Sequence, residues 1–130
     1  MSMPTLKRRV EASVDTVLAR MPEALAAEGF GVLTEIDVKQ TMKKKLDVDF
    51  RSYRILGACN PKLAKRALDT DLDVGVLLPC NVTVYEADDG TSVISAVDPE
   101  AAIGAFGDGP LRELAREVRE RLDRVLDAAS

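Results

Sequence analysis

The 130-residue chain contains no histidine and only two cysteines. Without histidine, the Ser-His and Cys-His catalytic pairs are excluded, and the commonest zinc ligand is missing. The side chain that normally titrates near neutral pH is missing as well. Most familiar hydrolytic and zinc chemistry is therefore excluded, and the thiols of Cys59 and Cys80 are the only soft ionisable groups.

The sequence also lacks a long apolar run and an excess of basic charge. Its apolar stretches, such as 76–78, are far too short to span a bilayer, and residues 1–10 have no apolar signal core. With 18 basic and 22 acidic residues, the net charge of −4 gives no general attraction to nucleic acid or anionic lipid. We therefore expect a cytoplasmic protein with reduced thiols and with no membrane or nucleic-acid partner.

The composition that remains is that of an ordinary globular domain. Apolar residues make up 46% of the chain and charged residues 31%. At this length the chain can build one hydrophobic core, and a second domain does not fit. We expect residues 1–130 to form a single domain.

Alternating apolar residues predict strands, and apolar residues three or four apart predict helices. The expected strands are 5–11, at a sheet edge, and 30–38, 50–58, 76–86 and 91–97. The expected helices are 13–28, 38–46, 61–69, 98–103 and the strongly amphipathic 110–128. Pro22 should kink or restart its helix, and Pro79 should mark a bulge, an edge or a strand that begins just after it. This order predicts an α/β domain of the α+β type: a two-layer sandwich whose mixed, largely antiparallel sheet has helices on one face.

The dipeptide Cys-Asn occurs twice, as Cys59-Asn60 and Cys80-Asn81. Asn60 is a good N-cap and is followed by proline, so Cys59 should lie beside the unpaired N–H groups of a helix start. That position favours a thiolate or a bound anion, and Lys62 would add positive charge if it points inward. The alternative is that Cys59 is simply a small buried residue at a strand end.

The second Cys-Asn dipeptide is expected to differ from the first. Cys80 has the same parity as Val82 and Val84, so its sulfur should face the core. Asn81 is expected to satisfy backbone groups around Pro79. Two thiols without histidine do not complete a four-ligand zinc site, so we expect no metal and no cofactor.

Glu35 and Asp37 are the remaining candidates for site chemistry. Alternation places Val32 and Ile36 on one strand face, with Leu33, Glu35 and Asp37 on the other. Two nearby carboxylates can divide acid and base roles only where their surroundings separate their pKa values, and no such signal is present. We expect a solvated face paired with lysine or arginine, keep Glu35 as a ligand-binding candidate, and assign no catalytic residue.

Three segments together resemble the DUF302 family. They are Gly29–Val38 (GFGVLTEIDV), Tyr53–Pro61 (YRILGACNP) and Leu77–Val82 (LLPCNV), followed by Ser95–Pro99 (SAVDP). The resemblance is close over about residues 28–103. It implies a compact two-layer α/β fold with a mixed sheet, in a family of small, mostly prokaryotic proteins whose function is not established. By analogy it also implies a homodimer.

The leading functional hypothesis is non-enzymatic binding of a small, anionic ligand or of a protein partner. Its candidate residues are Cys59, Asn60, Lys62, Cys80, Asn81 and Glu35. One alternative is thiol redox chemistry or soft-metal handling by the two cysteines, which requires their sulfurs to approach each other or to face a common site. The other alternative is a purely structural or interaction protein. The positions and exposure of the two sulfurs should distinguish these readings.

Overall fold

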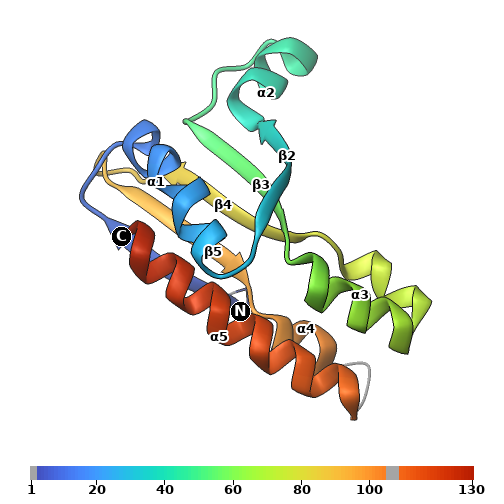
Figure 1. The fold of residues 1–130 in the computed structure, drawn as a ribbon. Helices are drawn as coiled ribbons and strands as arrows, with labels where there is room; N and C mark the ends of the chain where they lie inside the picture. Colours follow the sequence, from blue (N-terminus) through green and yellow to red (C-terminus); the bar gives the residue numbers. More distant parts are fainter. Residues whose placement is uncertain (1–2, 105–108) are drawn as a thin grey trace.

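The computed structural model describes residues 3–104 and 109–130, which form one five-stranded sheet and its helices (Figure 1). The strands are β1 (Thr5–Val10), β2 (Gly31–Asp37), β3 (Tyr53–Cys59), β4 (Cys80–Glu86) and β5 (Ser92–Val97). The helices are α1 (Val14–Ala27), α2 (Val38–Leu46), α3 (Pro61–Thr70), the 3₁₀ helix η1 (Leu72–Leu77), α4 (Pro99–Gly104) and α5 (Pro110–Ala129). The predicted α+β class is confirmed.

The strand order in the sheet is β1-β5-β4-β3-β2, so β1 lies at an edge as predicted. All four neighbouring pairs are antiparallel, which corrects the expectation of a mixed sheet. The reason is the position of the connecting helices. A parallel pair requires a crossover along the sheet face, whereas α2 and α3 lie beyond the strand ends, so each following strand runs back (Figure 1).

The core lies between the sheet and a layer made by α1 and α5 (Figure 1). Alternate strand residues point into this layer, because successive side chains leave opposite faces of a strand. The sheet contributes Leu6, Val10, Leu56, Ala58, Val82, Val84, Ile94 and Ala96, and the two helices contribute Val17, Met21, Leu25, Leu122, Val125 and Leu126. Burying each large apolar side chain stabilises the fold by about 1.5–3 kcal/mol.

The edge strand β1 is also held by charge. Arg8 points toward α5 and forms ion pairs with Asp123 at 2.6 Å and with Asp127 at 2.9 Å. These two carboxylates raise the pKa of the Arg8 guanidinium further above its ordinary value. The first strand and the last helix are thus joined directly.

The two prolines that were predicted to disturb secondary structure, Pro22 and Pro79, have different effects. α1 runs through Pro22 as one helix, so a restart there does not occur. Pro22 is exposed, whereas Met21 and Leu25 on either side of it are fully buried. Packing of that apolar stripe outweighs the one backbone hydrogen bond that proline cannot make. β4 begins at Cys80, directly after Pro79, as one of the predicted alternatives had it.

A β-bulge in β2 changes which side chains share a face. The register with β3 shifts between Val32 and Thr34, and Leu33 is the extra residue. Val32 is paired with Ala58 and Glu35 with Leu56, so these two lie on the helix-covered side, while Ile36 lies on the other. The predicted grouping of Val32 with Ile36 is therefore wrong.

The turn after α1 depends on Gly29. Its φ of +84° is a left-handed conformation, and a Cβ added there would lie 2.9 Å from Nδ2 of Asn60. Both the backbone conformation and the close approach require glycine. The turn thereby places the end of α1 against the beginning of α3.

We expect Gly29→Ala to lower the free energy of unfolding by about 1–2 kcal/mol, because the left-handed conformation is costly with a Cβ. Urea titration followed by circular dichroism measures this loss. The matched control is Gly31→Ala, since a Cβ there meets nothing within 4 Å. Equal losses in the two variants would contradict the role assigned to Gly29.

Candidate functional site

The two Cys-Asn dipeptides meet at one end of the sheet. β3 and β4 are antiparallel, and Cys80 is in register with Ala58 while Asn81 is in register with Gly57. The end of β3 therefore lies beside the start of β4. This is the end that α3, η1, α4 and α5 enclose.

A cavity of about 70 Å³ lies between these elements. Its wall includes Ala58, Cys59 and Cys80 from the strands, Leu63, Ala64 and Ala67 from α3, Ala102 and Ile103 from α4, and Leu111, Leu114, Ala115 and Val118 from α5. Among the described residues that line it, none carries a charge, and the polar side chain is that of Asn60. The cavity is therefore an apolar space beside the two thiols.

Asn60 is buried at the cavity wall, with 9% of its surface exposed. Its Oδ1 accepts a hydrogen bond from the Leu63 backbone N–H at 3.3 Å, which caps α3 as the sequence predicted. Its Nδ2 donates to the backbone carbonyl of Glu28 at 3.1 Å, at the end of α1. The amide thus satisfies one free group at each of two helix ends.

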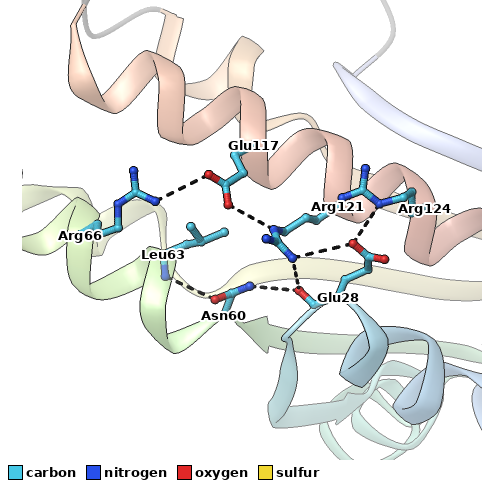
Figure 2. A network of polar contacts seen from close by, with 7 residues as sticks. All are labelled: Glu28, Asn60, Leu63, Arg66, Glu117, Arg121 and Arg124. Atoms are coloured by element: carbon cyan, nitrogen blue, oxygen red, sulfur yellow. Dashed lines mark hydrogen bonds and ion pairs between the residues drawn. The ribbon is translucent and has the colours of Figure 1, made fainter.

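Charged side chains around Asn60 form a network that joins α1, α3 and α5 (Figure 2). Arg121 donates to the Glu28 carbonyl at 3.2 Å and to Glu117 at 3.3 Å. Arg124 binds the Glu28 carboxylate at 2.9 Å, and Arg66 lies 3.6 Å from Glu117. Arg66, Arg121 and Arg124 are therefore each paired with a carboxylate.

Cys80 lies on the core side of β4, as its parity predicted, and packs against the core. Burial raises the pKa of its thiol to about 11, and a negative charge on Cys59 would raise it further. The Cys80 thiol is consequently neutral at physiological pH. Since the thiolate is the reactive form, Cys80 is poorly suited to nucleophilic chemistry.

Cys59 approaches the cavity from a different direction. It follows Ala58, whose side chain is fully buried in the core, so alternation along β3 directs the Cys59 side chain to the opposite side. Both cysteines are free and half-buried, and both line the cavity. The two cysteines therefore line one cavity although alternation directs their side chains to different sides of the sheet.

The other three candidates lie away from this cavity. Lys62 and Asn81 are exposed and do not line it. Glu35 is on β2, where Arg54 lies 3.6 Å from Glu35 and 3.3 Å from Asp37. The structure thus brings together Cys59, Asn60 and Cys80 and separates them from Lys62, Asn81 and Glu35.

The parts of the site that the sequence did not indicate come from distant segments. α4 and α5 contribute to the cavity wall, and the Glu28 carbonyl, which Arg121 also binds, holds the Asn60 side chain in that wall. The sequence did contain one indication of a cavity. Alanines such as Ala64 and Ala102 stand among larger apolar residues on their helices, and such small side chains leave space between packed elements. Spacing alone does not show which stripes face each other.

The described residues contain neither a metal-binding cluster nor a membrane-spanning helix. Within residues 3–104 and 109–130, no group of three or more acidic or cysteine side chains is arranged to hold a metal ion. Over the same ranges, no helix has the length and apolar character needed to cross a membrane.

The chain is similar to proteins without an assigned activity. The model of a family described as "Domain of unknown function DUF302" matches residues 6–129. A crystal structure of an uncharacterised conserved DUF302 protein from Bacillus stearothermophilus has 34% sequence identity and a TM-score of 0.92, covering 99% of this chain and 100% of that one. The comparison with curated proteins gave no match.

We expect Asn60→Ala to lower the free energy of unfolding by about 1–2 kcal/mol, because it removes the cap of α3 and the donor to Glu28. Asn60→Ser keeps an acceptor for the Leu63 N–H and should recover most of the capping part. Urea titration of the two variants measures the difference. Identical losses would show that the cap contributes nothing.

The Cys80 thiol should make stability depend on pH in the alkaline range. Its raised pKa means that the folded state holds the proton more tightly, so its contribution is complete below the unfolded pKa of about 8.5 and declines as pH rises toward the folded value. Near pH 10 the native protein should have lost about 1–2 kcal/mol relative to Cys80→Ala. Urea titrations at a series of pH values measure the free energy of unfolding of both proteins. The same dependence on pH in both would contradict the prediction.

Proposed function

The chain belongs to the DUF302 family, and since that family is described as being of unknown function, we propose a function from the cavity itself. The proposed function is non-enzymatic binding of a small, uncharged apolar ligand, or of the apolar end of a larger one. The observation that supports it is an apolar cavity of about 70 Å³ at the end of the sheet.

The size and lining of the cavity favour a ligand. Protein interiors are close-packed, and voids larger than a water molecule are few. An apolar cavity cannot hold a water molecule well, because water needs polar partners, whereas such cavities do bind apolar guests. The space suits a small apolar group better than a drug-sized molecule.

The same lining disfavours the anionic ligand that the sequence suggested. The capping oxygen of Asn60 and one of the two N–H groups of its amide are engaged, and Arg121 is paired with Glu117. Lys62 is exposed and lies outside the cavity wall. An unpaired charge moved from water into such a space would carry a large desolvation penalty. We therefore propose an uncharged ligand.

Binding is also better supported than thiol chemistry. Redox exchange begins with a thiolate, and a pKa of about 11 leaves Cys80 almost wholly protonated at neutral pH. The side chains of Cys59 and Cys80 leave opposite sides of the sheet, which does not favour a disulfide between them. Free thiols suit a reducing compartment, so we propose that the protein acts in the cytoplasm.

Xenon and benzene are suitable neutral probes, and benzoate is the charged counterpart of benzene. We expect xenon and benzene to shift the methyl NMR signals of cavity residues such as Leu63 and Leu114. A ligand at ~100 times its Kd adds about 2.7 kcal/mol to stability, which a thermal melt detects. Benzoate should have little effect, because its carboxylate would lose its hydration.

The matched pair Ala102→Leu and Ala101→Leu tests the location of binding. Ala102 lines the cavity, whereas Ala101 is exposed on the same helix. Filling the space with Ala102→Leu should abolish the shifts, and Ala101→Leu should retain them. Absence of shifts with both neutral probes would favour a purely structural protein, and equal effects of benzene and benzoate would restore the anionic hypothesis.

A further inference from the structure

A second hollow adjoins the apolar cavity. Its volume is about 120 Å³. It shares four wall residues with the cavity, which come from η1, α4 and α5: Val74, Leu77, Ile103 and Leu111. We call this space the outer hollow. Because the same side chains border both spaces, the outer hollow and the cavity are at most one side chain apart.

The outer hollow reaches the protein surface along η1. Val76 lines the outer hollow but not the cavity, and 83% of its surface is exposed. Val74, two residues earlier, is buried and borders both spaces. Apolar lining therefore continues from the cavity to the outside. Such a lining suits a ligand that is longer than the cavity and buries only one end in it.

The outer hollow differs from the cavity in its charge. Asp71 and Asp73 border it, and both are exposed. Among the described residues that line it, no basic side chain is present, and neither aspartate forms an ion pair with a described residue. Neither aspartate lines the cavity. Negative charge is thus confined to the outer end of an otherwise apolar space.

We propose that the ligand is a small organic cation, an apolar chain that ends in an ammonium group, with its chain in the cavity and its ammonium group beside Asp71 and Asp73. This inference rests on the proposed function and specifies its second form, in which the apolar end of a larger ligand enters the cavity. The group inside the cavity is uncharged. The ammonium group stays in the outer hollow, where it keeps contact with water and avoids the desolvation penalty of the cavity.

An organic cation fits the outer hollow better than a bare metal ion. Calcium takes about six to eight oxygen ligands. The outer hollow offers the carboxylates of Asp71 and Asp73, and one oxygen of Asp71 already accepts the Asp73 backbone N–H at 2.9 Å. An ammonium group gains from the charge of two carboxylates without needing a complete ligand shell, and its apolar chain adds the affinity of the cavity.

Hexylammonium, hexanol and hexanoate test the proposal, because they share one apolar chain and differ in the charge of the head group. Titration of the full chain, followed by methyl NMR signals, gives the Kd of each. We expect hexylammonium to bind about threefold tighter than hexanol, since an exposed ion pair changes affinity by up to about fivefold. Hexanoate should bind most weakly. In ~1 M salt, where the screening length is about 3 Å, the preference for the cation should disappear.

The NMR signals also locate the two ends of the ligand. Leu63 lines only the cavity and Val76 only the outer hollow. Hexylammonium should shift the methyl signals of both residues with the same Kd. Filling the cavity with Ala102→Leu should weaken the binding of hexylammonium, because its chain loses its place.

The matched pair Asp73→Asn and Asp49→Asn tests the head-group site. Asp73→Asn keeps the backbone N–H that Asp71 binds, so the cap of η1 is retained. The ratio of the hexanol Kd to the hexylammonium Kd should fall about twofold in this variant. Asp49→Asn removes the same charge from a side chain that is 97% exposed and does not line the outer hollow. It should keep the native ratio.

Equal binding of hexylammonium and hexanol would overturn this inference and leave apolar binding in the cavity intact. Failure of benzene, hexanol and hexylammonium alike would overturn the proposed function as well. Hexylammonium binding that persists in Ala102→Leu, or a preference that Asp49→Asn removes and Asp73→Asn does not, would contradict the assigned position of the cation. Should Asp73→Asn fail to fold, a preference of the native protein that is unchanged by salt would overturn the inference.

Discussion

The side chain of Asn60 is the interaction on which the arrangement of this protein depends. The oxygen of its amide caps α3, and the nitrogen donates to the backbone carbonyl of Glu28 at the end of α1. α1 belongs to the core layer and α3 to the cavity wall, so this contact sets one relative to the other. It requires Gly29, because any other residue would bring a Cβ too near the amide. Arg121 reinforces the same carbonyl from α5.

Polar and apolar groups are separated sharply around the cavity. The arginines and glutamates outside it neutralise one another in the network around Glu28 and Glu117. Inside, the wall consists of apolar side chains, the hydrogen-bonded Asn60 and two cysteines, of which Cys80 is held neutral by its burial. Because an ion pair satisfies its own members, the network can lie close to the cavity without making it polar. This separation is what makes an apolar guest the better match.

Local chemistry in the sequence accounts for much of this structure. The cap and proline at Asn60-Pro61, the parity of Cys80 and the amphipathic 110–128 segment predicted elements that the structure confirms. The bulge at Leu33 was missed, since a bulge exists only relative to a paired strand, and one extra residue reversed the predicted faces of β2. The cavity was missed because its walls come from segments some fifty residues apart, Ala64 and Leu114 among them. Whether Lys62 faces the cavity could not be predicted, because its direction depends on how α3 is rotated, and in the structure it is exposed and does not line the cavity.

The position of β1 has a consequence for how the protein is made. Of the described strands β1 is made first, but its only neighbour in the described sheet is β5, at residues 92–97. Its other attachment, through Arg8, is to carboxylates of α5 near the end of the chain. During synthesis β1 therefore stays without its partner strand until β5 has been made. Lys7, Arg8 and Arg9 on β1 are the kind of charged side chains that oppose pairing of a free strand with another chain.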